Sequence, residues 1–177
     1  MPCGSNVLCG DSVPCAGRAP RGGRCPKRGF MMNDTQRAIV ESKLTQILGF
    51  LGELEQVVHL PFEEYIQDFR NLRTTERTLE LLVEISSDIV GHLLTEKGLP
   101  PANSYRNVFI NASKADILSA SLVDRIIPLV ALRNRIIHEY DEQFDPKRAY
   151  DGFRLAPPVF RELAEHIFNF INHSCQK

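Results

Sequence analysis

The amino-acid sequence predicts an all-α protein, an antiparallel bundle of three or four long helices and two short ones. From Asn33 onward, apolar residues recur at intervals of three and four, the spacing that places them on one face of a helix. Only short alternating runs of apolar and polar residues occur, so the sequence indicates no strand. The expected fold is therefore a bundle in which the apolar helix faces pack together.

The first part of this region predicts two long helices with a short helical segment between them. Residues 34–58 follow Asn33, a residue type that caps helices well. The short segment, 61–69, opens with a proline, which is tolerated in the first turn of a helix. A second long helix over 72–97 should end at Gly98, because two prolines follow it closely.

The second part predicts a short helix or turn over 104–110 and then further long helices. A helix starting near Ser121 contains Pro128, which should kink it or move its effective start downstream. A last helical stretch over 146–172 begins with an Asp-Pro pair, which suits a cap and a first turn. The tandem prolines at 157 and 158 should split this stretch in two.

Residues 1–30 differ in composition from the rest of the chain. They hold four of the five cysteines and five basic residues against Asp11, a net charge of +4. The cysteine spacing matches no zinc pattern, and a disulfide knot has no secretory signal to accompany it. We expect residues 1–30 to be a disordered or spurious extension, residues 31–177 to form the domain, and the protein to be cytoplasmic and not membrane-bound.

The residues with the clearest chemistry lie together near the end of the predicted fourth long helix. That stretch reads Arg133-Asn134-Arg135-Ile136-Ile137-His138-Glu139-Tyr140. An arginine stays charged and holds two phosphate oxygens with its planar fork, and a histidine transfers protons near neutral pH. No metal-ligand spacing and no Gly-rich phosphate loop accompany them, so we expect no metal and no cofactor.

This stretch resembles the motif of the HEPN ribonucleases, in which four to six residues separate an arginine from a histidine. The HepT branch adds a tyrosine two residues later, and asparagine is also typical after the arginine; a softer resemblance extends over 35–172. The resemblance implies a HEPN-type bundle that forms a homodimer with the motifs facing across a cleft. It also implies an endoribonuclease toxin that acts on RNA and is neutralised by a small nucleotidyltransferase antitoxin of the MntA type.

On this resemblance we assign a role to each residue of the motif. Arg133 is the phosphate clamp and His138 the general acid or base, while Asn134 and Arg135 support them. Tyr140 is the residue to which the antitoxin would attach AMP. A nucleotide two residues from His138 would add negative charge and bulk where the RNA phosphate should lie.

The spacing of the arginine and the histidine raises a geometric question. On a straight α-helix, positions 133 and 138 point about 140° apart, whereas positions 134 and 138 share a face. Either the helix ends or distorts near His138, or the long Arg133 side chain reaches round, or a second protomer completes the site. We favour the dimer, which would supply a second histidine.

The chain outside residues 1–30 carries a net charge of −5, because the total is −1, so contact with RNA requires a local basic patch. Arg70, Arg73 and Arg77 lie on or just before the predicted helix 72–97, and Lys147 and Arg148 follow the motif. These residues either widen an RNA-binding patch or form solvated faces, and both interpretations stay open.

Two other functions remain as alternatives. The first is a non-catalytic HEPN binding module that partners a nucleotidyltransferase, which a buried and salt-bridged Arg133 without a cleft at the dimer seam would favour. The second is a purely structural oligomerising bundle, in which Arg133 and Arg135 pair with Glu139 or Asp141 and have no further role.

Overall fold

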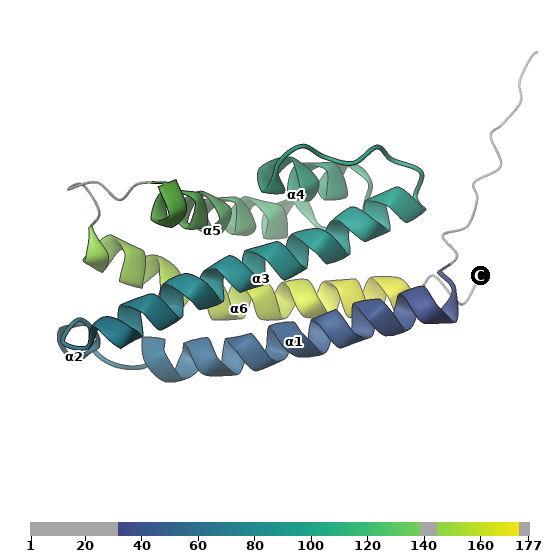
Figure 1. The fold of residues 1–177 in the computed structure, drawn as a ribbon. Coiled ribbons are helices and arrows are strands. Elements are labelled where there is room, and N and C mark those ends of the chain that lie inside the picture. The colour runs from purple at the N-terminus through teal and green to yellow at the C-terminus, as the bar shows by residue number, and fades with distance from the viewer. Residues whose placement is uncertain (1–31, 139–144, 174–177) are drawn as a thin grey trace, which may run out of the picture.

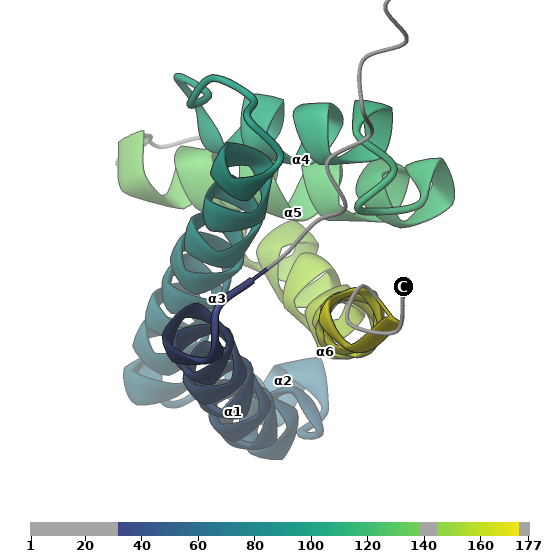
Figure 2. The same cartoon turned by 90° about the vertical axis from the view of Figure 1, so that its right-hand side faces the viewer.

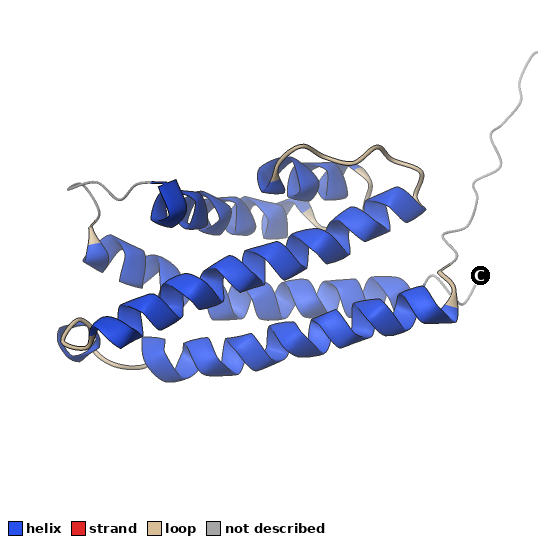
Figure 3. Cartoon of the chain, in the orientation of Figure 1, coloured by secondary structure: helices blue, strands red, loops and turns tan. Residues whose placement is uncertain are grey.

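The structure, a computed structural model, describes residues 32–138 and 145–173, with His138 and His173 described only in their backbones. These ranges contain helices and connecting loops but no strand, which confirms the all-α fold class (Figure 3). The N-terminal segment 1–30, expected to be a disordered or spurious extension, lies outside the described residues. Within the described ranges, no helix is both long enough and apolar enough to cross a membrane.

Six helices make up the described part of the chain. Three long helices, α1, α3 and α6, run side by side, and α5 lies with the short α4 on the side of α3 and α6 away from α1 (Figures 1 and 2). The core lies between these helices and includes Ile47, Leu79 and Phe160, all without solvent exposure. The bounds are α1 Asp34–Val58, α2 Phe62–Tyr65, α3 Phe69–Glu96, α4 Tyr105–Lys114, α5 Ala120–His138 and α6 Pro146–His173.

Capping side chains set the starts of the helices. Asn33 and Gln36 form a reciprocal capping box at the start of α1. The helix spans Asp34–Val58, which confirms the expected range 34–58 at both ends. The α3 helix begins at Phe69, three residues before the expected start, because the Asp68 side chain accepts a hydrogen bond from the Arg70 backbone. At its other end, Gly98 adopts a φ of 75°, a left-handed conformation that suits glycine after a helix.

The expectations based on proline were partly wrong. Pro61 is the N-cap of α2 and not part of its first turn. The α5 helix begins at Ala120 and continues through Pro128, so its start is not moved downstream.

The tandem prolines do not split α6, which runs without interruption from Pro146 to His173. Phe153, Ala156 and Phe160, on either side of the prolines, are fully buried, and α6 packs against α1, α3 and α5. This burial offsets the two backbone hydrogen bonds that the prolines cannot donate.

The close approach of α6 to α5 positions the motif. A Cβ added at Gly152 would lie 2.5 Å from the Leu132 side chain, so only a residue without a side chain fits there as packed. Leu132 is buried and immediately precedes Arg133. The packing of α6 against Leu132 therefore fixes the position of the part of α5 that carries Arg133.

Candidate functional site

Arg133 extends from α5 into the space between α3 and α4. Its guanidinium carbon lies 4.9 Å from the centroid of the Tyr105 ring, at the start of α4. One Nη atom lies 3.4 Å from a carboxylate oxygen of Glu80 on α3. The side chain is only 14% exposed, so two neighbouring helices determine where its charge lies.

The contacts of Arg133 leave part of its hydrogen-bonding capacity unused. Its contacts with Glu80 and with the Asn134 side chain are both 3.4 Å long, beyond the usual length of a charge-assisted hydrogen bond. Its Nε is buried and has no partner among the described residues. Glu80 makes a much shorter ion pair, 2.7 Å, with Arg77. A phosphate could therefore bind Arg133 without breaking a strong contact.

A small hollow of about 200 Å³ opens beside Arg133. Arg73 and Arg77 line it from α3, one helical turn apart, and each forms an ion pair with a glutamate three residues further along. Both arginine side chains are more than 60% exposed, so solvent screens their charges, whereas Glu76 and Glu80 are only 12% and 27% exposed. The hollow therefore gathers three arginines, together with the Glu76 and Glu80 side chains that also line it.

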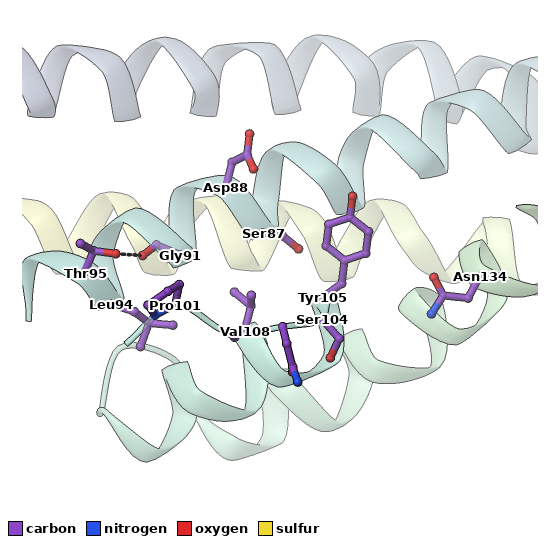
Figure 4. Close-up of a pocket in the computed structure, with 12 residues that line it drawn as sticks. Ser87, Asp88, Gly91, Leu94, Thr95, Pro101, Ser104, Tyr105, Val108 and Asn134 are labelled. Carbon is purple, nitrogen blue, oxygen red and sulfur yellow. Dashed lines mark hydrogen bonds between the residues drawn. The ribbon is translucent and has the colours of Figure 1, made fainter. Parts of the chain in front are cut away.

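A larger pocket of about 590 Å³ opens between α3 and the start of α4 (Figure 4). Asn134 and Tyr105 lie at one end of it, and Ser87 and Gly91 line it from α3. Asn134 is exposed, and its side chain borders this pocket. Arg133 and Asn134 thus lie between a charged hollow and a largely neutral pocket.

The structure describes some of the predicted site residues with their side chains, one only in its backbone and one not at all. Arg133 and Asn134 are in contact, and Arg135 is half-buried on the same helix. His138 is the last described residue of α5, and its side chain lies outside the description. Tyr140 lies outside the described residues altogether. The relative positions of Arg133, His138 and Tyr140 therefore stay predictions.

Two residues of the site were missed by the sequence analysis, Glu80 and Tyr105. Glu80 follows Arg77 by three residues, which predicts a local pair but no contact with Arg133. Tyr105 follows Ser104, which is the N-cap of α4. Neither pattern indicates a contact with α5, because the helix packing alone brings these residues to Arg133.

No group of three or more potential metal ligands occurs among the described residues. The chemistry that the arrangement offers is the binding of an anion beside a neutral pocket.

The sequence resemblance to the HEPN ribonucleases predicts an all-α bundle, and the described helices form such a bundle. Comparison with known families agrees: the family model described as "Ribonuclease HepT-like" matches residues 47–167. The tRNA nuclease HepT of Aphanizomenon flos-aquae is 33% identical over 127 residues, which cover 71% of this chain and 84% of that protein. The chain belongs to the HepT-like ribonuclease family.

Solved structures agree on the fold. A tri-AMPylated HEPN toxin of Shewanella oneidensis, in complex with an MNT antitoxin, has a TM-score of 0.68 at 22% identity. The match covers 78% of this chain and 99% of that one. A crystal structure of a toxin–antitoxin with AMP-PNP has a TM-score of 0.66 at 21% identity and covers 77% and 99% of the two chains.

Proposed function

We propose that this protein is a metal-independent endoribonuclease toxin of a toxin–antitoxin system. Arg133 binds the scissile phosphate and stabilises its charge, His138 transfers protons, and Asn134 and Arg135 support the pair. The observation that carries the proposal is the guanidinium of Arg133, which Tyr105 and Glu80 hold beside an arginine-lined hollow. The relative named as a tRNA nuclease makes RNA the substrate class to test.

The proposed reaction needs only the RNA and the protein. The 2′-hydroxyl loses its proton and attacks the adjacent phosphorus, and the bond to the 5′-oxygen of the next nucleotide breaks as that oxygen gains a proton. His138 serves one of the two proton transfers, and its counterpart in a second protomer would serve the other. Arg133 stabilises the additional negative charge on the phosphoryl oxygens.

This reaction predicts the chemistry of the product ends. Purified protein should convert a single-stranded RNA into fragments that carry a 2′,3′-cyclic phosphate and a 5′-hydroxyl. A kinase-labelling assay and mass spectrometry of the fragments would identify these ends. Products with a 5′-phosphate would contradict attack by the 2′-hydroxyl.

We also propose that AMP transfer to Tyr140 silences the enzyme, and that the partner is a nucleotidyltransferase of the MNT type. The tyrosine oxygen would attack the α-phosphorus of ATP, with loss of the tyrosine proton and release of pyrophosphate. The similarity to a toxin solved in tri-AMPylated form with its antitoxin supports this part. Incubation with such an enzyme and ATP should add AMP to the wild type and not to Tyr140→Phe, as measured by mass spectrometry.

The homodimer belongs to the same proposal. Positions 133 and 138 point in different directions on a regular helix, and α5 is helical as far as His138. A second protomer would bring another histidine toward the hollow. Sedimentation equilibrium should give twice the mass of the 20.0 kDa chain, and a monomer that cleaves RNA at full rate would contradict the dimeric site.

One observation favours a second function, a non-catalytic binding module that partners a nucleotidyltransferase. Arg133 is largely buried and paired with Glu80, as expected of an arginine that serves only to stabilise the packing of the helices. Under this alternative, Arg133→Ala weakens folding or binding to the partner, and RNA stays intact with both wild type and variant.

A further inference from the structure

The pocket between α3 and α4 differs in chemistry from the hollow on the other side of Arg133. Among its lining residues the charged one is Asp88, whose carboxylate already lies 3.3 Å from the Lys43 ammonium group on α1. The remaining lining is neutral and combines hydroxyl and amide groups with apolar surface from Leu94, Pro101 and Val108. A phosphate gains no positive charge there, whereas a neutral group with a polar edge fits this lining.

The pocket also contains a buried group that lacks a partner. Ser87 is only 4% exposed, and its hydroxyl makes no hydrogen bond within the described structure. A buried hydroxyl without a partner is costly, and a ligand that offers a donor or acceptor would remove this cost once the Ser87 side chain turns its oxygen toward the pocket. Figure 4 shows Ser87 between Gly91 and Tyr105, on the α3 side of the pocket.

The position of the pocket relates it to the proposed nuclease chemistry. Asn134 and Tyr105 line one end, and both contact Arg133. A phosphate bound by Arg133 would thus have the neutral pocket on one side and the arginine-lined hollow on the other. This is the arrangement that a nucleotide needs, with a charged backbone and a neutral, planar base.

We propose that this pocket binds one nucleobase of the RNA, next to the phosphate held by Arg133; the inference rests on the proposed nuclease function. The apolar lining contacts the faces of the base, and Ser87 and Asn134 form hydrogen bonds with its edge. The enzyme therefore cleaves single-stranded RNA with a preference for one base beside the cut.

Two glycines provide a matched test. A Cβ added at Gly91 meets no atom within 4 Å, so the side chain of Gly91→Leu begins in open space and should extend into the pocket. A Cβ added at Gly52 on α1 is equally free, and Gly52 does not line the pocket, so Gly52→Leu is the control. Ser87→Ala and Ser86→Ala form a second pair, because both hydroxyls are buried and unpartnered but Ser87 alone of the two lines the pocket.

The experiment maps cleavage of a single-stranded RNA that contains all four bases in every context. Gly91→Leu should lower kcat/KM about tenfold or more, because the base loses its contact with the pocket. The variant should also cleave beside all four bases at similar rates. Gly52→Leu should stay within about twofold of the wild type. Equal rate and equal preference in Gly91→Leu would overturn the nucleobase pocket and leave the proposed function intact.

A binding measurement keeps the two claims separate. Adenosine, guanosine, cytidine and uridine are each titrated into the full chain, and the amide resonances of Ser87 and Tyr105 are followed by NMR. At least one nucleoside should shift them in the wild type and none in Gly91→Leu, and no shift in the wild type would overturn the inference. Failure of the wild type to cleave any RNA would instead overturn the proposed function.

Discussion

The guanidinium of Arg133 lies 4.9 Å from the centroid of the Tyr105 ring, which joins the motif on α5 to the first turn of α4. An aromatic face holds a planar guanidinium in a fixed plane and leaves the N–H groups at its edge available. Glu80 approaches that edge at 3.4 Å. The arrangement leaves a mostly buried arginine with hydrogen-bond donors that its described neighbours do not fully use.

The planar shape of Arg133 should matter as much as its charge. Arg133→Lys keeps the charge but removes the fork and the stacking on Tyr105, so RNA cleavage should fall by about a hundredfold or more. Arg125→Lys, at an exposed pair with Glu162, should leave the rate unchanged. Circular dichroism verifies that Arg133→Lys is folded. Cleavage of RNA by this variant at the wild-type rate would contradict the role of Arg133 as a bidentate clamp.

Glu80 should oppose RNA binding in the free protein, because it contacts both Arg77 and Arg133. Glu80→Gln keeps the shape and removes the negative charge, so affinity for RNA should rise several-fold and fall more steeply with salt. Fluorescence anisotropy with labelled RNA measures both effects. Glu162→Gln is the matched control at the exposed pair with Arg125, and an equal gain in that variant would show a non-specific effect of charge.

Much of the fold followed from sequence, because local signals and the final packing agree. The Asn33 capping box fixes the start of α1, and Gly98 marks the end of α3. The prediction that the prolines split α6 was wrong because it considered only local backbone preference. The helix stays continuous because it buries Phe153 and Phe160. Short-range rules therefore fail where tertiary packing opposes them.

The candidate site was predictable only in part, for a related reason. Arg133 and Asn134 could be predicted because they are neighbours in a motif that is typical of a family, and their roles stay predictions. Glu80 and Tyr105 contact Arg133 from two other helices, and no sequence spacing encodes such contacts. The pocket likewise depends on how α3 and α4 pack.

The prolines in α6 lead to a prediction about stability. Pro158 is exposed, so Pro158→Ala restores a backbone donor without loss of buried surface and should raise the free energy of unfolding by about 1–3 kcal/mol. Chemical denaturation measures this change. Pro157 is buried, so Pro157→Ala should gain less; destabilisation by Pro158→Ala would mean that the helix depends on the proline ring.

Tyr65 should make stability depend on pH in the alkaline range. Burial raises the pKa of its hydroxyl from 10.0 to about 12, although a hydrogen bond with Thr75 acts in the opposite direction. Its contribution is complete below pH 10, where both states are protonated, and falls as pH rises toward 12, because the unfolded chain ionises first. The loss should be about 2 kcal/mol.

Tyr65→Phe provides the control, since phenylalanine does not ionise. The stability difference between wild type and variant should shrink or reverse between pH 9 and pH 12, as followed by urea denaturation at each pH (roughly the range set by the tyrosine pKa). A difference that stays constant over this range would show that the Tyr65 hydroxyl ionises equally in both states.

The most direct test of the central claim is RNA cleavage in excess EDTA, with the wild type and His138→Ala compared at equal concentration. The account predicts that the wild type cleaves under these conditions and that His138→Ala, folded to the same degree, loses about a hundredfold or more of the rate. Equal cleavage by the two proteins, or cleavage by the wild type that stops when EDTA is added, would contradict metal-independent catalysis through His138.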